Sequence, residues 1–569
     1  MEQTKHCLSQ QPNLYCQLKP EASDIIQPRN NSSSYKPSIW KYDFIQSLDT
    51  KYEQEEGYKL RDQTLKEKVK RLFGESIDVL AKLELIDNIW KLGLSTLFEE
   101  EIHEALDNIA SIQNNNSCVE EDLYTTALCF RLLRQHGYEI SEDIFTGFVD
   151  EKGSLSTAKC RDAKGLIELF EASHLALEGE TILDKAKVFS IGTLKYIHCS
   201  TNLDSELAEK IARALELPLH RRVPWFEVRW HINAYENNKQ MMNTSLLELA
   251  KLNFIRVQAA LQNDLREVSR WWRNLGLIEN LNFSRDRLVE SFMCAVGLLY
   301  DTEFRSFRKW LTKVVIFILV IDDIYDIYGS LQELQYFTNA VDRWDSKEIE
   351  HLPECMKISF QALYDTTNEM AYEIQKEKGW SDSALAHLKK AWADFCKSLL
   401  VEAKWCNEGH TPSLQEYLNN AWISSSGPLL SVHSFFSTMK EDTEETAHFL
   451  WDNQELLYNS SLVIRQCNDL GTSTAELERG DVASSILCYM RELDVSEEKA
   501  RSHIKEKINK CWININGHCF TQSSSLKPFV NIITNCARVT HCLYQNGDGF
   551  GVQDRDTKEQ ILSLLIKPI

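Results

Sequence analysis

Apolar residues recur at three- and four-residue spacing along most of the chain, with polar residues between them. The stretch after residue 79 illustrates the pattern, with apolar side chains at Leu80, Leu83, Leu85, Ile89 and Leu92. This spacing places apolar groups on one face of an α-helix. Helix-breaking residues are scarce, since the 569 residues include only 21 glycines and 11 prolines. The pattern predicts an all-α protein, and the lack of a fixed-period repeat argues against a regular solenoid.

One apolar run departs from this spacing. The segment VVIFILV at 314–320 is rich in β-branched residues, which alone would suit a buried strand. Residues 303–313, EFRSFRKWLTK, continue the helical pattern into it, so we expect a helix buried on all sides. The run is too short to cross a bilayer, and no stretch of about eighteen apolar residues occurs in the chain. No membrane span is therefore expected.

A polar stretch, YENNKQMMN at 235–243, separates two long amphipathic regions. We therefore expect two helical domains, over residues 30–235 and 236–569. Residues 1–29 have no arginine before Arg29 and no hydrophobic segment, so they resemble neither a secretory signal nor a transit peptide. We interpret them as a disordered leader on a cytoplasmic protein.

The composition narrows the classes of ligand. The formal net charge of -21 makes nucleic acid or an anionic membrane surface an unsuitable partner. Any anionic substrate must then be held by metal ions or by a local basic patch. The 16 cysteines are scattered without CxxC pairs, as is typical of reduced thiols in an intracellular protein.

Three aspartates follow the apolar run directly. Asp322 and Asp326 are four residues apart, which places both on one helix face at about 6 Å along the axis, with Asp323 between them. Carboxylates are ligands that Mg²⁺ prefers, and the ion commonly shares them with substrate phosphates. The alternative is a solvated acidic helix end, because unpaired buried carboxylates would be too costly.

A second group of oxygen ligands lies in NDLGTSTAE at 468–476. Asn468, Thr472 and Glu476 recur every four residues and share a helix face. Asn and Thr with a later Glu could instead begin a helix. The apolar run SSLVI before Asn468 already has a helical pattern, which favours the ligand interpretation. Two such helices predict a metal cluster on opposite walls of a cleft, with a strongly anionic ligand.

Three arginines are candidates to bind that anion. Arg465 lies one helical turn before Asn468, and Arg285 and Arg287 form a basic pair upstream of the aspartates. Guanidinium groups suit phosphate oxygens that metals leave uncovered. Each of them alone would more often be a surface residue.

From about Tyr35 to Ile569 the sequence resembles the plant class I terpene synthase family, on motifs that occur in the same order. They are YKPSIW at 35–40, ALCFRLLRQHGY at 127–138, LPLHRRVPWFEVRW at 217–230, RDR at 285–287, DDIYD at 322–326, NDLGTSTAE at 468–476, RGD at 479–481 and GDGFG at 547–551. The resemblance implies two helical domains, an N-terminal α-barrel that is non-catalytic and a C-terminal bundle that carries the active site around an apolar pocket.

The resemblance also implies roles for individual residues. Asp322, Asp323 and Asp326 match the aspartate-rich metal motif, with Asp322 and Asp326 as direct ligands, and Asn468, Thr472 and Glu476 match the second metal triad. Arg285, Arg287 and Arg465 match arginines that hold the departing diphosphate. Further matches are Ser424, Ser425 and Ser426, at a helix break with carbonyls facing the pocket, and Tyr544 and Asp548, in a segment that closes over the site.

The implied reaction is metal-assisted ionisation of a prenyl diphosphate. Three Mg²⁺ ions, for which Mn²⁺ could substitute, neutralise the leaving diphosphate, and an allylic cation forms without a protein nucleophile. Apolar and aromatic walls exclude water until a proton is lost. A monomer without nucleic-acid or membrane partners is expected.

Three positions depart from the family pattern. Asn30 and Asn31 replace two arginines associated with isomerising the substrate before cyclisation, and Cys294 in ESFMCAVG replaces a pocket tryptophan. Loss of that ring removes a face that could stabilise a cation. The N-terminal domain has no DxDD motif, so protonation-initiated cyclisation is not expected.

Other functions are disfavoured by particular residues. A chain-elongating prenyl synthase has two DDxxD motifs, and a non-catalytic helical scaffold would have lost metal ligands. An isoprene synthase places pocket-narrowing phenylalanines where this chain has Val315 and Ile464, so we expect a pocket for more than five carbons. The GDGFG segment lacks the strand and helix that a dinucleotide-binding GxGxxG requires.

The expected product is an acyclic sesquiterpene such as (E,E)-α-farnesene, made from farnesyl diphosphate. The segment LKPEASDIIQ at 18–27 resembles the leader of α-farnesene synthases within the family. A monoterpene synthase that makes ocimene or linalool from geranyl diphosphate is the alternative.

Overall fold

The computed structural model describes most of the chain and shows an all-helical protein. The described residues are 36–49, 56–75, 78–114, 122–200, 203–239, 242–281, 283–380, 383–439, 450, 453–479, 483–520, 526–545, 547–551, 553 and 555–569. Within these ranges the only strand-like pairing is an isolated antiparallel bridge between Val149 and Leu155. The predicted all-α fold is confirmed. The leader expected at 1–29 lies outside the described residues.

The N-terminal helices begin mostly at aspartate or proline residues. Asp122, Asp162 and Asp204 each accept a backbone N–H bond at the start of a helix, and Pro224 occupies the first turn of another. The elements are α1 (Tyr42–Gln46), α2 (Glu56–Glu75), α3 (Val79–Lys91), η1 (Ser95–Leu97), α4 (Glu99–Asn114), α5 (Leu123–Gln135), η2 (Glu142–Phe148), α6 (Ala163–Ser173), α7 (Thr181–His198), α8 (Ser205–Glu216), η3 (Leu219–Arg221) and α9 (Pro224–Asn237).

The C-terminal part contains the longer helices. They are α10 (Thr244–Leu275), α11 (Leu277–Asn280), α12 (Leu288–Leu298), α13 (Arg305–Asp323), η4 (Ile324–Tyr328), α14 (Leu331–Arg343), η5 (Ser346–Ile349), α15 (Glu354–Lys378), α16 (Ser383–Glu408), α17 (Leu414–Ser424), α18 (Gly427–Thr438), α20 (Gln454–Arg479), α21 (Ser485–Leu493), α22 (Glu497–Phe520), α23 (Lys527–Tyr544) and α24 (Arg555–Leu565).

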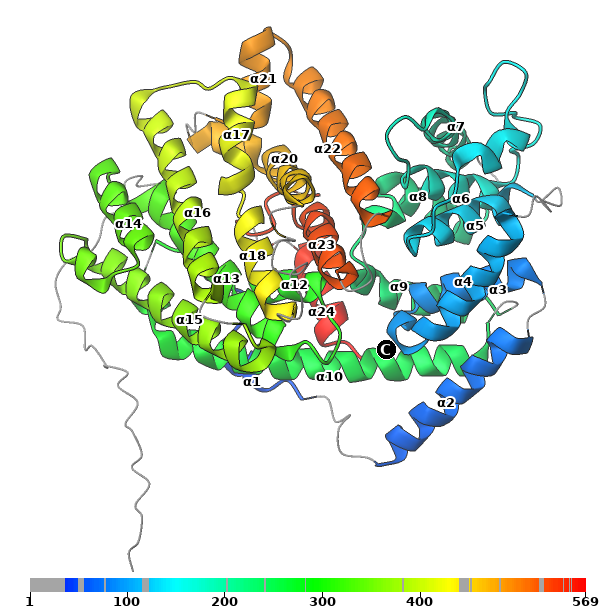
Figure 1. The fold of residues 1–569 in the computed structure, drawn as a ribbon, viewed down its shortest axis with the longest axis horizontal. Helices are drawn as coiled ribbons and strands as arrows, with labels where there is room; N and C mark the ends of the chain where they lie inside the picture. Colours follow the sequence, from blue (N-terminus) through cyan, green and yellow to red (C-terminus); the bar gives the residue numbers. More distant parts are fainter. Residues whose placement is uncertain are drawn as a thin grey trace, which may run out of the picture.

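Two groups of helices lie side by side along α10 (Figure 1). The N-terminal group, α3 to α9, occupies one end of the molecule, and the C-terminal group, α12 to α24, forms the larger remainder. A separate small hydrophobic core around Phe130 and Leu169 lies within the N-terminal group, whereas the main core continues through both groups. Helix α9 ends at Asn237 and α10 begins at Thr244, next to the predicted boundary at 235–243, and the division into domains at 235 stays a prediction.

Helix α13 runs through the centre of the C-terminal group. The residues of the β-branched run, Val314–Val320, all lie within it and are buried except for Ile318, so the predicted buried helix is confirmed. The helix does not end at the aspartates, because a turn of π-helix continues it from Ile324 to Tyr328. Such turns occur mostly as local bulges at functional sites. The π-helical turn carries Asp326 and leads into α14, which begins with a capping box formed by Ser330 and Glu333.

Two further expectations concern the molecule as a whole. No helix in the described part of the chain is long and apolar enough to cross a membrane. The cysteines whose side chains the structure describes are free thiols, as their scattered spacing predicted.

Candidate active site

A cavity of about 190 Å³ lies inside the C-terminal group. Its polar lining comes mainly from the end of α13, the middle of α20, the break between α17 and α18, and the end of α23 with the chain after it. Its apolar lining comes mainly from α12, α13, α16, α18 and α23. The polar lining residues are Arg285, Asp322, Asp326, Ser424, Ser425, Ser426, Arg465, Asn468, Thr472, Thr540, Tyr544 and Asp548. The other lining residues are Cys294, Leu298, Leu311, Val315, Ile318, Leu319, Phe395, Leu430, Ile464, Cys536, Val539, Leu543 and Phe550.

The three aspartates of the first motif do not share one environment. Asp322 lines the cavity with its side chain 33% exposed, and Asp326 lines it from the π-helical turn. The side chain of Asp323 is only 1% exposed and does not line the cavity. Its Oδ2 accepts bonds from Ser284 Oγ at 3.0 Å and from the Arg285 backbone N–H at 2.8 Å. Burial raises the pKa of Asp323 to about 6, despite the neighbouring guanidinium of Arg285.

The ligand role predicted for Asp323 stays a prediction, and this structure shows the carboxylate next to Arg285. Its Oδ1 lies 2.9 Å from Arg285 Nε, while Arg285 Nη2 lies 2.5 Å from Asp322 Oδ2. Asp323 therefore forms an ion pair with Arg285 without lining the cavity. Asp322 and Asp326 are the two carboxylates of the motif that line it.

The three predicted arginines also lie in different environments, two at the cavity and one away from it. Arg285 and Arg465 line the cavity, and Arg465 donates through Nη2 to Ser424 Oγ at 3.1 Å and through Nη1 to Asn468 Oδ1 at 3.4 Å. Arg287 is buried away from the cavity and donates to the backbone oxygens of Phe550 at 2.7 Å, Gly551 at 3.3 Å and Lys36 at 3.2 Å. The direct role predicted for Arg287 at the diphosphate stays a prediction, and in this structure its guanidinium joins three chain segments next to the site.

Helix α20 presents the second oxygen-ligand motif. Asn468 lies in the middle of this helix, which begins at Gln454, so the alternative of a helix cap is excluded. Asn468 and Thr472 line the cavity, and Thr472 Oγ1 donates to the Asn468 carbonyl at 2.9 Å. Glu476 falls within α20, but its side chain lies outside the described residues. Its role as a ligand stays a prediction.

The predicted helix break at the serines is present. Helix α17 ends at Ser424 and α18 begins at Gly427, with Ser426 in the left-handed conformation at a φ of 65°. Gly427 lies so close to α20 that a Cβ there would come within 2.1 Å of Ser461 Oγ. This contact places the break between α17 and α18 against α20, the helix that carries Ile464 and Arg465.

The segment after α23 covers one side of the cavity. Asp548 Oδ1 accepts backbone N–H bonds from Phe550 at 3.0 Å and Gly551 at 2.8 Å, which folds residues 548–551 into a tight loop. Tyr544 and Asp548 both line the cavity, and burial raises the pKa of the Tyr544 hydroxyl. The structure thus brings together the two residues that the resemblance placed in a covering segment.

Two family models match separate parts of the chain. The metal-binding domain of the terpene synthase family matches residues 273–514, and the N-terminal domain of terpene synthases matches residues 39–215. The chain belongs to the terpene synthase family. Among curated relatives, it is 60% identical to an alpha-farnesene synthase from Ricinus communis, over 98% of this chain and 99% of that protein. It is 55% identical to an (E,E)-alpha-farnesene synthase from Malus domestica, over 97% and 96% of the two chains.

Solved terpene synthase structures share the whole architecture. A limonene synthase with 2-fluorolinalyl diphosphate superposes with a TM-score of 0.90 at 38% identity, covering 94% of this chain and 99% of that chain. The isoprene synthase of grey poplar (Populus x canescens), in complex with three Mg²⁺ ions and dimethylallyl-S-thiolodiphosphate, superposes at 0.84 with 42% identity and the same coverage.

The donor set of this terpene synthase fits Mg²⁺. The candidate ligands that line the cavity are the carboxylates of Asp322 and Asp326, the amide of Asn468 and the hydroxyl of Thr472. All four supply oxygen, the donor that this hard cation prefers, without the thiolate or imidazole typical of zinc sites.

Two carboxylates near the site were missed by sequence reasoning. Glu402 Oε1 on α16 accepts from Ser424 Oγ at 2.5 Å and Asn420 Nδ2 at 3.1 Å, and burial raises its pKa. Glu290 Oε1 on α12 accepts from Trp40 Nε1 at 3.0 Å and from Gln553 Nε2 at 2.6 Å, which joins residues that are 513 positions apart in the sequence. The only signal in the sequence was a single acid within each apolar run, SLLVEAKW and LVESFM.

We expect Cys294→Trp to raise the cyclic fraction of the product while lowering total turnover. Cys294 is buried and lines the cavity from α12, so an indole there would face the substrate chain and could stabilise positive charge further along it. Its bulk would also reduce the space available for the substrate. Gas chromatography of the products at matched conversion measures both effects. A fixed product ratio with reduced turnover would mean that Cys294 controls volume alone.

Proposed function

We propose that this terpene synthase converts farnesyl diphosphate to an acyclic sesquiterpene, (E,E)-α-farnesene. The observation that carries the proposal is that the cavity has a polar part and an apolar part. Asp322, Asp326, Asn468 and Thr472 line one part of it, whereas apolar side chains of α12, α13, α16, α18, α20 and α23 line much of the rest. A diphosphate attached to a hydrocarbon chain matches both parts.

Asp322 and Asp326 on one wall, and Asn468, Thr472 and Glu476 on the other, would hold Mg²⁺. When bound, the metal supplies Lewis-acid neutralisation of the charge on the leaving diphosphate. We propose three ions, as in the isoprene synthase complex, and we propose that Mn²⁺ can replace them. Asp322, Asp326, Asn468 and Thr472 already line one cavity, so these four side chains need little rearrangement to bind the metal.

Arg285 and Arg465 bind the diphosphate oxygens that the metal leaves uncovered. Arg285 is oriented by Asp323, and Arg465 by Ser424 and Asn468, so both guanidinium groups are held at the cavity wall. When the carbon–oxygen bond breaks, the electron pair leaves with the diphosphate and the carbon chain becomes an allylic cation. The apolar wall excludes water from this cation. We propose that a proton of the chain then passes to the departing diphosphate, which gives a neutral acyclic polyene.

The choice of substrate rests on two lining positions and on the relatives. Val315 and Ile464 leave the apolar part of the cavity wider than phenylalanines would, and Cys294 offers no aromatic face for extended cyclisation. The two relatives with 60% and 55% identity are farnesene synthases, whereas a myrcene synthase from Quercus ilex is 44% identical. We also propose a cytoplasmic, monomeric enzyme.

The purified protein should release (E,E)-α-farnesene from farnesyl diphosphate when Mg²⁺ is present. Incubation with farnesyl and geranyl diphosphates in parallel, followed by gas chromatography and mass spectrometry of the volatiles, measures substrate and product together. Chelation with EDTA should abolish product, and Mg²⁺ or Mn²⁺ should restore it. Ocimene or linalool from geranyl diphosphate, without turnover of farnesyl diphosphate, would contradict the proposal and establish the monoterpene alternative.

A further inference from the structure

Glu402 lies on α16, next to the break between α17 and α18, and does not line the active-site cavity. Its Oε1 accepts bonds from Ser424 Oγ at 2.5 Å and from Asn420 Nδ2 at 3.1 Å. Ser424 is only 4% exposed and lines the cavity from the end of α17. The carboxylate of Glu402 therefore bonds to a residue of the cavity wall without reaching the cavity itself.

The hydroxyl of Ser424 joins Glu402 to Arg465 on α20. Ser424 Oγ accepts a bond from Arg465 Nη2 at 3.1 Å and donates its own hydrogen to Glu402 Oε1. Because a hydroxyl has one hydrogen and two acceptor lone pairs, both bonds form at the same time. The three side chains come from α16, α17 and α20, and their bonds make a continuous chain from the carboxylate to the guanidinium.

The charges at the two ends of this chain attract each other. Burial raises the pKa of Glu402, and the guanidinium of Arg465 opposes that rise. Hydrogen bonds with a charged group at one end are stronger than bonds between neutral groups, and consecutive bonds polarise one another. The chain of bonds therefore holds the Nη2 group of Arg465 more firmly than the hydroxyl of Ser424 would alone.

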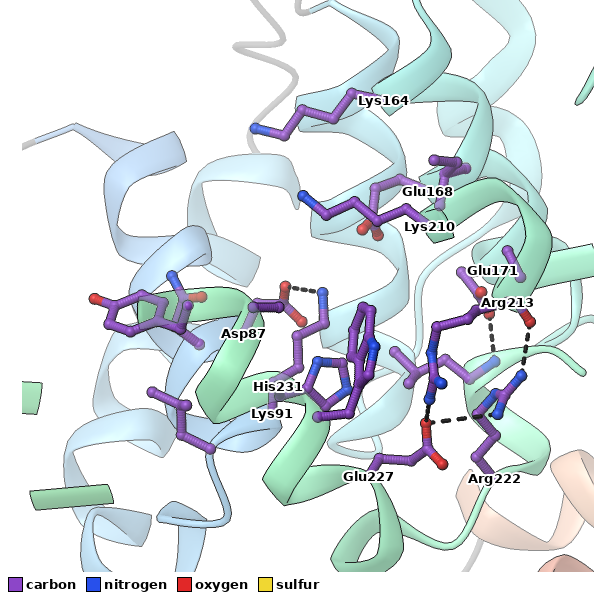
Figure 2. Close-up of a pocket in the computed structure, with 18 of the residues that line it drawn as sticks. Asp87, Lys91, Lys164, Glu168, Glu171, Lys210, Arg213, Arg222, Glu227 and His231 are labelled. Atoms are coloured by element: carbon purple, nitrogen blue, oxygen red, sulfur yellow. Dashed lines mark hydrogen bonds and ion pairs between the residues drawn. The ribbon is translucent and has the colours of Figure 1, made fainter. Parts of the chain in front are cut away.

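A carboxylate of the N-terminal group shows a different arrangement. Asp87 lines a cavity of about 240 Å³ there, and Figure 2 shows it bonded directly to Lys91, with 2.6 Å between Oδ2 and Nζ. Such a pair balances the negative charge where it lies. Glu402 differs, because the groups bonded to its carboxylate are an uncharged hydroxyl and an uncharged amide. Its charge is therefore directed through Ser424 to Arg465.

We infer that Glu402 is a positioning residue for the reaction, which holds the guanidinium of Arg465 towards the diphosphate through Ser424. The inference rests on the proposed function only in that Arg465 binds the diphosphate. Arg465 Nη1 also donates to Asn468 Oδ1 at 3.4 Å, and that oxygen belongs to a proposed metal ligand. The bond to Ser424 shares no oxygen with the metal, so it can hold the guanidinium whether or not metal is bound.

Calorimetric titration of the full chain with diphosphate, at a fixed Mg²⁺ concentration, tests the inference. Glu402→Gln keeps an oxygen that accepts from Ser424, so the affinity should stay within about threefold of the wild type. Glu402→Met has a similar length but only a weak acceptor, so the affinity should fall at least about tenfold. Glu408→Met, which replaces an exposed glutamate at the end of the same helix, is the matched control and should leave the affinity unchanged.

A double-mutant cycle separates positioning from a general effect on the fold. In Arg465→Gln the guanidinium that Glu402 orients is gone, so adding Glu402→Met should change the diphosphate affinity by less than about twofold. Thermal unfolding without ligand shows whether each variant is folded. An equal loss of affinity from Glu402→Met in both backgrounds would establish a structural role and overturn the inference. Wild-type affinity in folded Glu402→Met would overturn it as well.

Ser424→Ala keeps the inference testable if Glu402→Met does not fold, because it removes only the hydroxyl that joins the two charges. Its diphosphate affinity should fall at least about fivefold, since the bond that is lost has a charged group on either side. Wild-type affinity in folded Ser424→Ala would overturn the inference, and so would a wild type that does not bind diphosphate at millimolar concentration. Failure of the proposed function would appear separately, as a wild type that binds diphosphate but does not turn over farnesyl diphosphate.

Discussion

Replacing Asp322 with alanine should lower the turnover of farnesyl diphosphate by two or more orders of magnitude at saturating Mg²⁺. Asp322 faces the active-site cavity, and its carboxylate also lies 2.5 Å from Arg285. One substitution therefore removes a proposed metal ligand and the partner of an arginine that we propose binds the diphosphate. Each tenfold in rate corresponds to about 1.4 kcal/mol of barrier, so the expected loss is at least about 2.8 kcal/mol. Steady-state kinetics with a radiolabelled substrate measures it.

The helical fold should survive this substitution. Asp322 is one-third exposed at the cavity wall, and its removal leaves no cavity in the packed core. Asp342→Ala is the matched control, because Asp342 lies on α14, forms an ion pair with Lys397 at 2.5 Å and does not line the cavity. Glu476→Ala should behave like Asp322→Ala. Turnover near the wild-type rate in both variants, with circular dichroism unchanged, would contradict the metal assignment.

The double variant Val315→Phe with Ile464→Phe should shift the ratio of farnesyl to geranyl turnover by at least tenfold towards geranyl diphosphate. Val315 on α13 and Ile464 on α20 both line the cavity, so two phenyl rings would shorten the space that holds the far end of the chain. A packed interior absorbs added bulk poorly, and the longer substrate should lose more binding energy than the shorter one. Competitive turnover of the two substrates in one reaction measures the ratio.

A control substitution at an exposed residue separates a shorter cavity from a general effect of introducing phenylalanine. Ile278→Phe makes the same change at a residue that is 42% exposed on α11, so the ratio should stay at the wild-type value. Each single variant should give a smaller shift than the pair. An unchanged ratio in the folded double variant would show that these two side chains do not limit the length of the substrate.

The features predicted correctly from the sequence depend on neighbours along the chain. The helical pattern into Val314–Val320, the four-residue spacing of Asp322 and Asp326, and the break before Gly427 are all local, so periodicity and turn chemistry were sufficient. The turn of π-helix was not foreseen, yet it leaves Asp326 at the cavity because it adds less than one residue to each helical turn.

The contacts that the sequence could not predict belong to side chains whose partners are distant in sequence or lie outside the motif. Arg287 belongs to the same short motif as Arg285, but its carbonyl partners include one at Phe550, 263 residues away. Asp323 is adjacent to Asp322, yet it turns towards Ser284 and Arg285. Glu402 carries no motif at all, and only the packing of α16 against the helix break brings it to Ser424. Such contacts depend on the tertiary arrangement, which a spacing pattern does not contain.

The bonds that join both ends of the chain around α12 affect the order in which the protein can mature during synthesis. Arg287 requires the carbonyls of Lys36, Phe550 and Gly551, and Glu290 requires Trp40 and Gln553. Domains usually begin to fold from the N-terminus as the ribosome releases them. Here the walls of the catalytic chamber can form before the loop at 548–551 does, because the bonds that hold this loop require Phe550, Gly551 and Gln553 to have left the exit tunnel. A nascent chain arrested before Phe550 would therefore contain every proposed metal ligand but would lack the bonds that hold the loop at 548–551 over the active site.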